Sequence, residues 1–344
     1  MADSRYVLMH KNTPVADLQL DTDTGVIRSV GHVYNALHVP VGIPVKKGVI
    51  DRSALNTWWT GRAIPASRDR IRDALRELEL ASTQLLLDKC LGLSLSDQYW
   101  IRPAGSASTW RDVNCFENDF SEELGELLLP HDASSVPSLI EKIRGNADLL
   151  ASSPDAALNG NLPKRWTIEG GQRMLVKSGR SSGRFQEPFN EKIASVLCSR
   201  LLDEGDYVAY ELEDGGFMKW TSRCKPMTDQ VTEFVPAWAL LCSSKRPSDL
   251  GLHDFYVSAC AAHGLDVRED VEKMLVIEQR IYADIIAHIS RSLAVLLRDA
   301  AVVARVDCLQ SFARIACERR YVRPVLDDGK RIDIRQGRHP VIET

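Results

Sequence analysis

The sequence predicts an α+β fold with a mixed N-terminal module, a second sheet with its own helix, and long C-terminal helices that end in a β-strand. Three observations predict it. The first 50 residues hold several short β-prone runs, a Gly-Gly pair separates two later runs, and no Gly or Pro occurs between Leu265 and Tyr321. We expect three parts, at residues 1–150, 151–276 and 277–344.

The N-terminal part is expected to begin with strands and to continue with helices. Residues 6–10 (YVLMH) and 15–21 (VADLQLD) are β-prone runs that are separated from later segments by turn residues. Helical periodicity begins near Ser67, and a further helix is expected after a cap at Ser82 or Thr83. This part is therefore predicted to mix both kinds of structure.

The second part is expected to contain a β-hairpin and a helix. Residues 145–164 are rich in Asn, Ser, Pro and Gly, and part of this segment is predicted to be a domain boundary. Two strand-like runs then flank Gly170-Gly171, a pair typical of tight hairpins. Pro188 suits the first turn of the helix that follows. Further strands are expected in residues 206–215 and 216–224.

The third part is dominated by a helical pattern. Apolar residues recur there at steps of three and four: Ile277, Ile281, Ile285, Ile289, Leu293, Leu296 and Ala300. This pattern predicts either one long amphipathic helix or two helices with a bend near Asp299. A lever, a packed helical hairpin and an ordinary pair of core helices all have this periodicity. The final residues, with a Gly-Arg-His-Pro turn at 337–340, predict a turn and a strand.

Composition restricts the classes of function. The chain has 344 residues, 44% hydrophobic and 26% charged, as in soluble globular proteins of two or three domains. The net charge of −4 gives no overall attraction to nucleic acid or acidic lipid. Residues 277–344 carry 12 Lys or Arg and 9 Asp or Glu, a local balance of +3. A phosphate-binding surface and a solvated helix face explain this excess equally well.

The cysteines and the N-terminus indicate the compartment. None of the 8 cysteines pairs with another at C-x-x-C spacing, so reduced and mostly buried thiols are expected. The first residues, MADSRYVLMHKN, lack the apolar run of a signal peptide, and no stretch approaches 18 apolar residues. We therefore expect a cytoplasmic protein with no membrane partner.

Most motifs that carry chemistry are absent from the sequence. The segment 171–178 comes nearest to a phosphate-binding GxxxxGK[ST] loop, but it has Val176 where the second Gly is required. There is no HExxH, no Cys/His cluster and no G-x-S-x-G. One constellation remains, because Lys177 lies on a predicted strand and Glu191 follows on a predicted helix. Nucleotide sites of kinases use a strand Lys and a helix Glu in this order, although unrelated proteins also match such a spacing.

Several phrases in the first 276 residues occur in a family's characteristic order. They are WWTGRAIPASRDRI (58–71), GLSLSDQYWIRP (92–103), DVNCFENDFS (112–121), SPDAALNGNLPKRW (153–166), MLVKSG (174–179) and FQEPFNEKIAS (185–195). These phrases resemble HipA-like serine/threonine kinases, namely their N-terminal module over 1–150 and the first kinase lobe over 151–276. The resemblance implies a kinase-like lobe that binds ATP.

The same resemblance assigns roles to particular residues. It implies that Lys177 contacts the nucleotide phosphates, that Asn190 and Glu191 form the pair at the start of the supporting helix, and that the loop 159–164 closes over the nucleotide. The family continues with a catalytic loop and a metal-binding Asp, and nothing similar follows Val276 here. We therefore expect no catalytic residue, and no magnesium ion held by this chain alone.

Residues 277–344 resemble a different family. IEQRIYADIIAHI (277–289), VARVDCLQSFARIACERRYVRPVL (303–326) and IDIRQGRHPVIE (332–343) are similar to MutS-type mismatch-repair proteins, where lever helices return to the ATPase domain. The resemblance implies two packed helices and the first strands of that domain. It also implies binding of ATP and of mismatched DNA, with DNA as a partner of the C-terminal tail.

The sequence therefore predicts a hybrid of an incomplete HipA-like kinase and a MutS-type fragment, joined without a linker at Val276/Ile277. Alternatives are a HipA-like serine/threonine protein kinase with residual nucleotide binding, and a non-functional junction product. Incomplete domains leave apolar faces uncovered, so self-association is expected as well.

Overall fold

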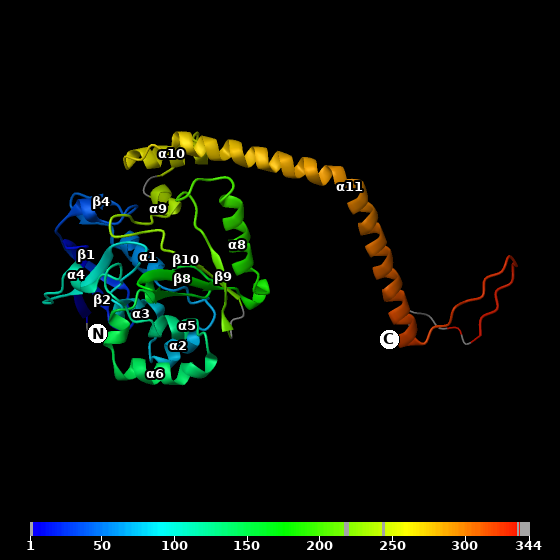
Figure 1. Ribbon diagram of the computed structural model, residues 1–344, viewed down its shortest axis with the longest axis horizontal. Coiled ribbons are helices and arrows are strands. Elements are labelled where there is room, and N and C mark those ends of the chain that lie inside the picture. The colour runs from blue at the N-terminus through cyan, green and yellow to red at the C-terminus, as the bar shows by residue number, and fades with distance from the viewer. Residues whose placement is uncertain (1–2, 217–219, 243–244, 336, 338–344) are drawn as a thin grey trace. The chain divides into compact units, whose positions relative to one another are not determined.

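The computed structural model describes residues 3–216, 220–242, 245–335 and 337. The fold is α+β, as predicted, and the chain divides into two compact units, Met1–Leu265 (unit 1) and Asp266–Thr344 (unit 2). Figure 1 shows that both four-stranded sheets belong to unit 1 and that one long helix dominates unit 2.

The first sheet of unit 1 has four antiparallel strands in the order β3-β2-β1-β6. Alternate residues of its strands point into the core, which is why short β-prone runs suffice to build it. The predicted strands near the N-terminus are confirmed. The strands are β1 (Asp3–His10), β2 (Thr13–Asp21), β3 (Ile27–Val33) and β6 (Tyr99–Pro103), and a small hairpin is formed by β4 (Val45–Lys46) and β5 (Val49–Ile50).

Short helices follow these strands. The Asp51 side chain caps the first helix by accepting a hydrogen bond from Ala54 N at 3.0 Å, and the predicted Ser82 cap accepts from Leu85 N at 3.1 Å. The first helix was not among the predicted ones. The helices are α1 (Arg52–Arg62), α2 (Ile71–Glu77), α3 (Thr83–Lys89), α4 (Trp110–Val113), α5 (Glu123–Leu128), α6 (Val136–Gly145) and α7 (Asp148–Ala151).

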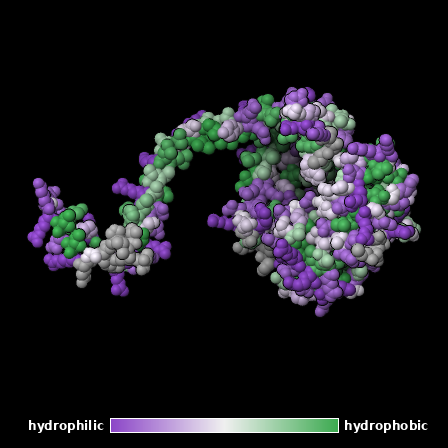
Figure 2. Space-filling model, turned by 180° about the vertical axis from the view of Figure 1, so that it is seen from behind, coloured by the Kyte–Doolittle hydropathy of each residue, from purple (hydrophilic) through white to green (hydrophobic). Residues whose placement is uncertain are grey.

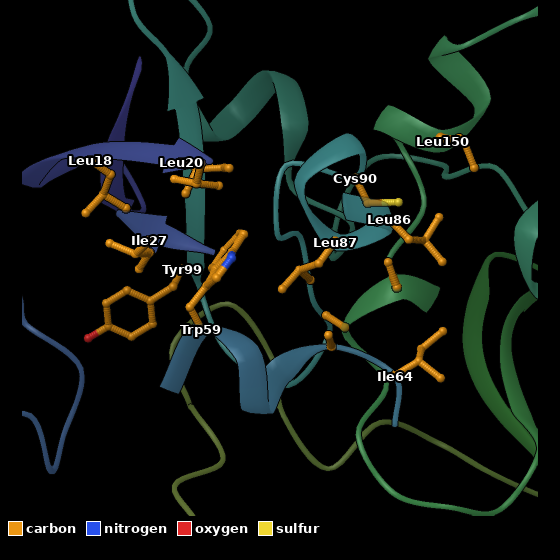
Figure 3. Packing of buried hydrophobic residues seen from close by; sticks show 14 of the residues in the cluster. Leu18, Leu20, Ile27, Trp59, Ile64, Leu86, Leu87, Cys90, Tyr99 and Leu150 are labelled. Atoms are coloured by element: carbon orange, nitrogen blue, oxygen red, sulfur yellow. The ribbon is translucent and has the colours of Figure 1, made fainter. Parts of the chain in front are cut away.

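Helix α1 packs against the first sheet through Trp59, at the centre of the main core (Figure 3). The indole Nε1 donates a hydrogen bond to Gly25 O at 2.9 Å, so the one polar atom of this buried ring is satisfied. Gly92 has a φ of +64°, and a Cβ there would lie 2.7 Å from the Trp59 ring. Only glycine suits this position, which explains why α3 is followed by one.

The second sheet of unit 1 has the order β7-β8-β10-β9 and is antiparallel throughout. The predicted hairpin is confirmed: Gly170 and Gly171 both have positive φ, and Glu169 pairs directly with Gln172. Pro188 lies in the first turn of the following helix, as expected. The elements are β7 (Lys164–Glu169), β8 (Gln172–Ser178), α8 (Glu187–Cys198), β9 (Glu211–Asp214), β10 (Trp220–Cys224), α9 (Ala237–Cys242) and α10 (Leu252–Ala262).

The segment 145–164, part of which was predicted to be a domain boundary, is largely packed into unit 1. Residues 153–158 are buried, and Asp155 is fully inaccessible to solvent. Asp155 accepts hydrogen bonds from Trp166 N at 2.8 Å and from Ser153 Oγ at 3.2 Å. These bonds join the end of the helical region to the start of β7, so no exposed linker separates residues 1–150 from the second sheet.

Unit 2 consists mainly of α11 (Arg268–Arg319), which passes through Val276/Ile277 without interruption. Of the two predicted alternatives, one continuous helix is observed, and Figure 1 shows that it changes direction partway along. The expected pair of packed helices is wrong, because a single helix occupies residues 268–319 and none of its residues is buried. It ends at Arg320, whose φ of +53° turns the chain so that Tyr321 N donates to Ala316 O at 2.8 Å.

The C-terminal residues contain no strand between residues 321 and 335. The predicted turn and strand at residues 337–343 lie, except for Gly337, outside the described residues. Four thiols are buried as expected, those of Cys90, Cys115, Cys224 and Cys260, whereas two on α11 are exposed. Among the helices that the structure describes, none combines the length and apolar character needed to cross a bilayer.

The buried carboxyl group of Asp155 makes the stability of unit 1 depend on pH. Burial raises its pKa from the ordinary value of 3.8 to about 7, although Arg165 and Arg68 attract the ionised form. The folded state therefore binds the proton more tightly than the unfolded state does. The stabilisation from this proton is complete at low pH and is lost as pH rises from about 4 towards 7.

We predict that Asp155→Asn, which does not ionise, removes this contribution. Relative to the variant, the native chain should lose on the order of 1 kcal/mol of unfolding free energy per pH unit between pH 5 and 7. Urea unfolding followed by tryptophan fluorescence measures this, because all 7 tryptophans lie in unit 1. Parallel pH profiles of the two proteins would contradict the prediction.

Candidate functional site

A pocket of about 340 Å³ lies in unit 1 on one face of the second sheet. Residues of β7, β8 and β10 form one wall. The opposite wall comes from the N-terminal module, through Trp58, Arg62 and Tyr99, and from the segment 225–239 that follows β10. The site therefore draws on residues that are far apart in the sequence.

Strand register arranges the sheet wall in two rows. Lys164, Lys177 and Ser222 are direct neighbours across β7, β8 and β10. The second row consists of Trp166, Leu175 and Cys224. Each of them is two residues from a member of the first row on its own strand, so both rows lie on the same face of the sheet. The first row is polar and cationic, and the second is apolar, so the pocket has two chemically different ends.

Lys177 is held in place by two side chains at the cationic end, and a third side chain holds one of these two. Its Nζ donates to Glu191 Oε1 at 2.8 Å and to Tyr210 Oη at 2.5 Å. Glu191, on α8, uses its other oxygen to accept a hydrogen bond from the Ser222 hydroxyl. Burial lowers the pKa of Lys177, but the hydrogen bonds to Glu191 and Tyr210 outweigh this effect and raise its pKa above the ordinary value. The ammonium group is thus fixed and charged.

The predicted residues are placed as follows. Lys177 and Glu191 are brought together by the structure, 14 positions apart in sequence. Asn190 lies on the exposed side of α8, where its backbone N donates to Gln186 O at 3.0 Å, and it does not line the pocket. Its expected role beside Glu191 is therefore not seen in the arrangement of these residues.

Lys164 is a second ammonium group in the pocket. Burial, together with the charges of Arg68 and Lys177, lowers its pKa to about 8. The charged side chains that line the pocket are those of Arg62, Lys164, Lys177 and Lys225 and the carboxylates of Asp97 and Glu233. The charges of Lys164 and Lys177 repel each other, and an anion bound between them would reduce this repulsion.

The loop that precedes β7 is tied to the N-terminal module. The buried Arg68 donates from Nε to Gly160 O at 3.0 Å and from Nη2 to the carbonyls of Gly160 and Leu158. Ser67 Oγ donates to Asn161 Oδ1 at 2.8 Å. Leu158 and Asn159 line the pocket as a result, so the loop predicted to cover a ligand already lies at its border.

The segment after β10 is also attached to the module. Gln98 Nε2 donates to the carbonyls of Asp229 and Thr232 at 2.8 and 2.6 Å, and Phe234 N donates to Ser96 O at 2.8 Å. Glu233 Oε1 lies 2.8 Å from His10 Nε2. These bonds close the apolar end of the pocket by holding residues 225–239 against the N-terminal strands.

The arrangement suits a ligand that carries phosphate at one end and a flat ring at the other. Lys164 and Lys177 lie at one end of the pocket, and Trp166 and Leu175 offer an apolar surface at the other. Within the described part of the chain, no three His, Cys, Asp or Glu side chains come together as metal ligands.

Sequence reasoning missed Tyr210 and Ser222 as site residues, and it included Lys164 only as the last residue of the loop 159–164. The position of Lys164 in the site could have been predicted from the sequence, because a two-residue turn at Gly170-Gly171 fixes the strand register and places Lys164 opposite Lys177. No sequence pattern indicated Tyr210 or Ser222. Tyr210 is 33 residues from its partner Lys177, and Ser222 is 31 residues from its partner Glu191, so both contacts depend on how the chain returns to the sheet.

Comparison with known proteins identifies relatives of one part of the chain. Over 72 residues it is 47% identical to the DNA mismatch repair protein MutS of Bacteroides fragilis and 46% identical to that of Syntrophobacter fumaroxidans. These matches cover 21% of this chain and 8% of each relative. A match to the MutS protein of Chlorobium phaeobacteroides extends over 119 residues at 33% identity, 35% of this chain and 13% of the relative.

No protein-family model and no solved structure matches the chain. The chain spans about a tenth of the length of the curated relatives that it matches. A segment of about 72 residues is therefore homologous to the DNA mismatch repair protein MutS.

Proposed function

We propose that unit 1 binds ATP in the pocket between the second sheet and the N-terminal module. The observation that carries this proposal is the pair formed by Lys177 on β8 and Glu191 on α8, with Nζ and Oε1 2.8 Å apart. A strand lysine that a helix glutamate orients towards a nucleotide is the arrangement that kinases use for the phosphates. The resemblance of residues 1–276 to HipA-like kinases supports the same assignment.

The residues present fit such a ligand. Lys177 and Lys164 would hold the phosphates, while Trp166, Leu175 and Leu158 would contact the base. The volume of about 340 Å³ falls in the range of roughly 300–1,000 Å³ that is usual for small-molecule sites. The ligand phosphates would add negative charge beside the two lysines, and Glu191 and Tyr210 would keep Lys177 oriented.

The proposal concerns binding. The alternative of a HipA-like serine/threonine protein kinase adds transfer of the terminal phosphoryl group to a protein hydroxyl. Radiolabelled ATP distinguishes the two, because a kinase incorporates label and a binding unit only exchanges it. The alternative of a non-functional junction product requires that neither binding nor transfer occurs.

A second candidate function belongs to the MutS-like segment, which we propose contacts DNA. Arg291, Arg298 and Arg305 follow one another at steps of seven on α11, so they lie along one side of the helix, and all three are exposed. Three arginines on one side of a helix would together neutralise more phosphate charge than one arginine would, which strengthens binding to DNA. The homology to MutS over 72 residues favours DNA as the polyanion.

Replacing Lys177 tests the nucleotide site. We predict that Lys177→Ala weakens ATP binding by at least about tenfold, or roughly 1.4 kcal/mol, because it removes a charge-assisted contact to phosphate. Isothermal titration calorimetry of the full chain measures the affinity. The exposed Lys46→Ala serves as the matched control and should bind as the native chain does. Equal affinities for all three proteins would refute the proposal.

Lys164 predicts a pH dependence for the same site. Because its pKa in the free protein is about 8, the side chain loses its charge as pH rises through this value. We predict that ATP affinity falls between pH 7 and 9.5 in the native chain. The affinity of Lys164→Met should be lower at pH 7 and nearly flat over this range. A native profile that is as flat as that of the variant would contradict the role of Lys164.

The DNA proposal is tested by fluorescence anisotropy with a labelled mismatched duplex. We predict measurable binding of the full chain at low salt and a steep loss of affinity as salt increases. Arg291→Gln with Arg298→Gln should weaken binding, whereas the exposed pair Arg72→Gln with Arg111→Gln in unit 1 should leave it unchanged. Absence of binding at low salt, or an equal loss in both double variants, would disprove this candidate.

A further inference from the structure

Helix α11 presents an apolar surface that no described residue of unit 2 covers. It is 52 residues long, and none of them is buried. Figure 2 shows hydrophobic side chains along much of its length. A helix in water is stabilised mainly by packing of its apolar side. We therefore expect the apolar side of this helix to pack against a binding partner.

The apolar residues follow the period of a coiled coil. They recur at alternating steps of four and three and form a seam: Tyr282, Ile286, Ile289, Leu293, Leu296, Ala300 and Val303. The large side chains of this seam are 44% to 69% exposed. This spacing is the one that places side chains of one helix into holes on another, over a length of roughly 30 Å at 1.5 Å per residue. The partner that it fits is therefore another helix.

Charge along α11 is divided between its two halves. Five acidic and three basic residues lie between Arg268 and Asp284, and five basic and three acidic residues lie between Arg291 and Arg319. Two copies that run in parallel would place like charges side by side. Two copies that run antiparallel would place the acidic half of each against the basic half of the other, which is the favourable arrangement.

Side-chain size favours the same orientation. If two copies cross antiparallel with Arg291 at the centre, Tyr282 of one faces Ala300 of the other, and Ile286 faces Leu296. The largest residue of the seam then meets the smallest. In a parallel pair with matched register, Ala300 would face Ala300 and leave a gap, while Tyr282 would face Tyr282.

From the period, the charge division and the size pairing, we propose that α11 is a self-association helix whose partner is α11 of a second copy of this chain, antiparallel and centred near Arg291. The seam lies on the opposite side of the helix from Arg298 and Arg305, so pairing through the seam is independent of the proposed contact with DNA.

Sedimentation velocity of the full chain tests the proposal. We expect a dimer of twice the 38.4 kDa chain mass. Leu293→Glu, at the centre of the seam, should lower the dimer fraction by at least about tenfold in association constant. Ala287→Glu, on the outer side of the same helix, is the matched control and should remain dimeric. A monomeric native chain, or a dimer that Leu293→Glu leaves intact, would overturn the proposal.

Disulfide trapping tests the orientation in a chain whose exposed Cys308 and Cys317 are replaced by serine. Two versions are mixed, one with Val276→Cys and one with Ala304→Cys. The antiparallel register brings these positions together, so we expect the mixed disulfide to dominate after oxidation. Predominance of the two like disulfides would show a parallel pair and overturn the proposal. Circular dichroism of each variant verifies that the helix is intact.

Discussion

The ion pair between Lys177 and Glu191 is the interaction on which the candidate site depends. It joins β8 to α8, and Glu191 also accepts a hydrogen bond from the Ser222 hydroxyl of β10, so one carboxylate connects these three elements. Tyr210 fixes the same ammonium group from the chain that enters β9. Glu191 and Tyr210 stabilise the charged ammonium group of Lys177. Because a lysine ammonium group can donate three hydrogen bonds, Lys177 can also donate one to a ligand.

The N-terminal module completes the site and does not merely precede it. Arg68 holds the loop at Leu158 and Gly160, and Gln98 holds the segment after β10, so both borders of the pocket are set by residues before position 100. Asp155 connects the same region to β7 from within the core. This explains why residues 1–265 form one compact unit although their sequence suggested two parts.

Local rules predicted the parts of this fold that depend on neighbours in the chain. The hairpin at Gly170-Gly171, the Ser82 cap and the long helix all follow from turn chemistry, capping and periodicity. Helix α1 was missed because Thr, Trp and Gly favour helices weakly, and burial of Leu55 and Trp59 decides its formation instead. Arg68 was missed because its partners lie about 90 residues away, where no local pattern reaches.

The two units thus offer different chemistry: a pocket with a fixed cation in unit 1, and a long helix with an apolar side and a basic side in unit 2. The pocket carries the central claim, and hydrogen–deuterium exchange of the full chain with and without ATP tests it most directly. The account predicts slower exchange in residues 158–164, 175–178 and 222–226, with α6 unchanged. Unaltered exchange in all three segments at saturating ATP, or protection confined to other parts of the chain, would contradict it.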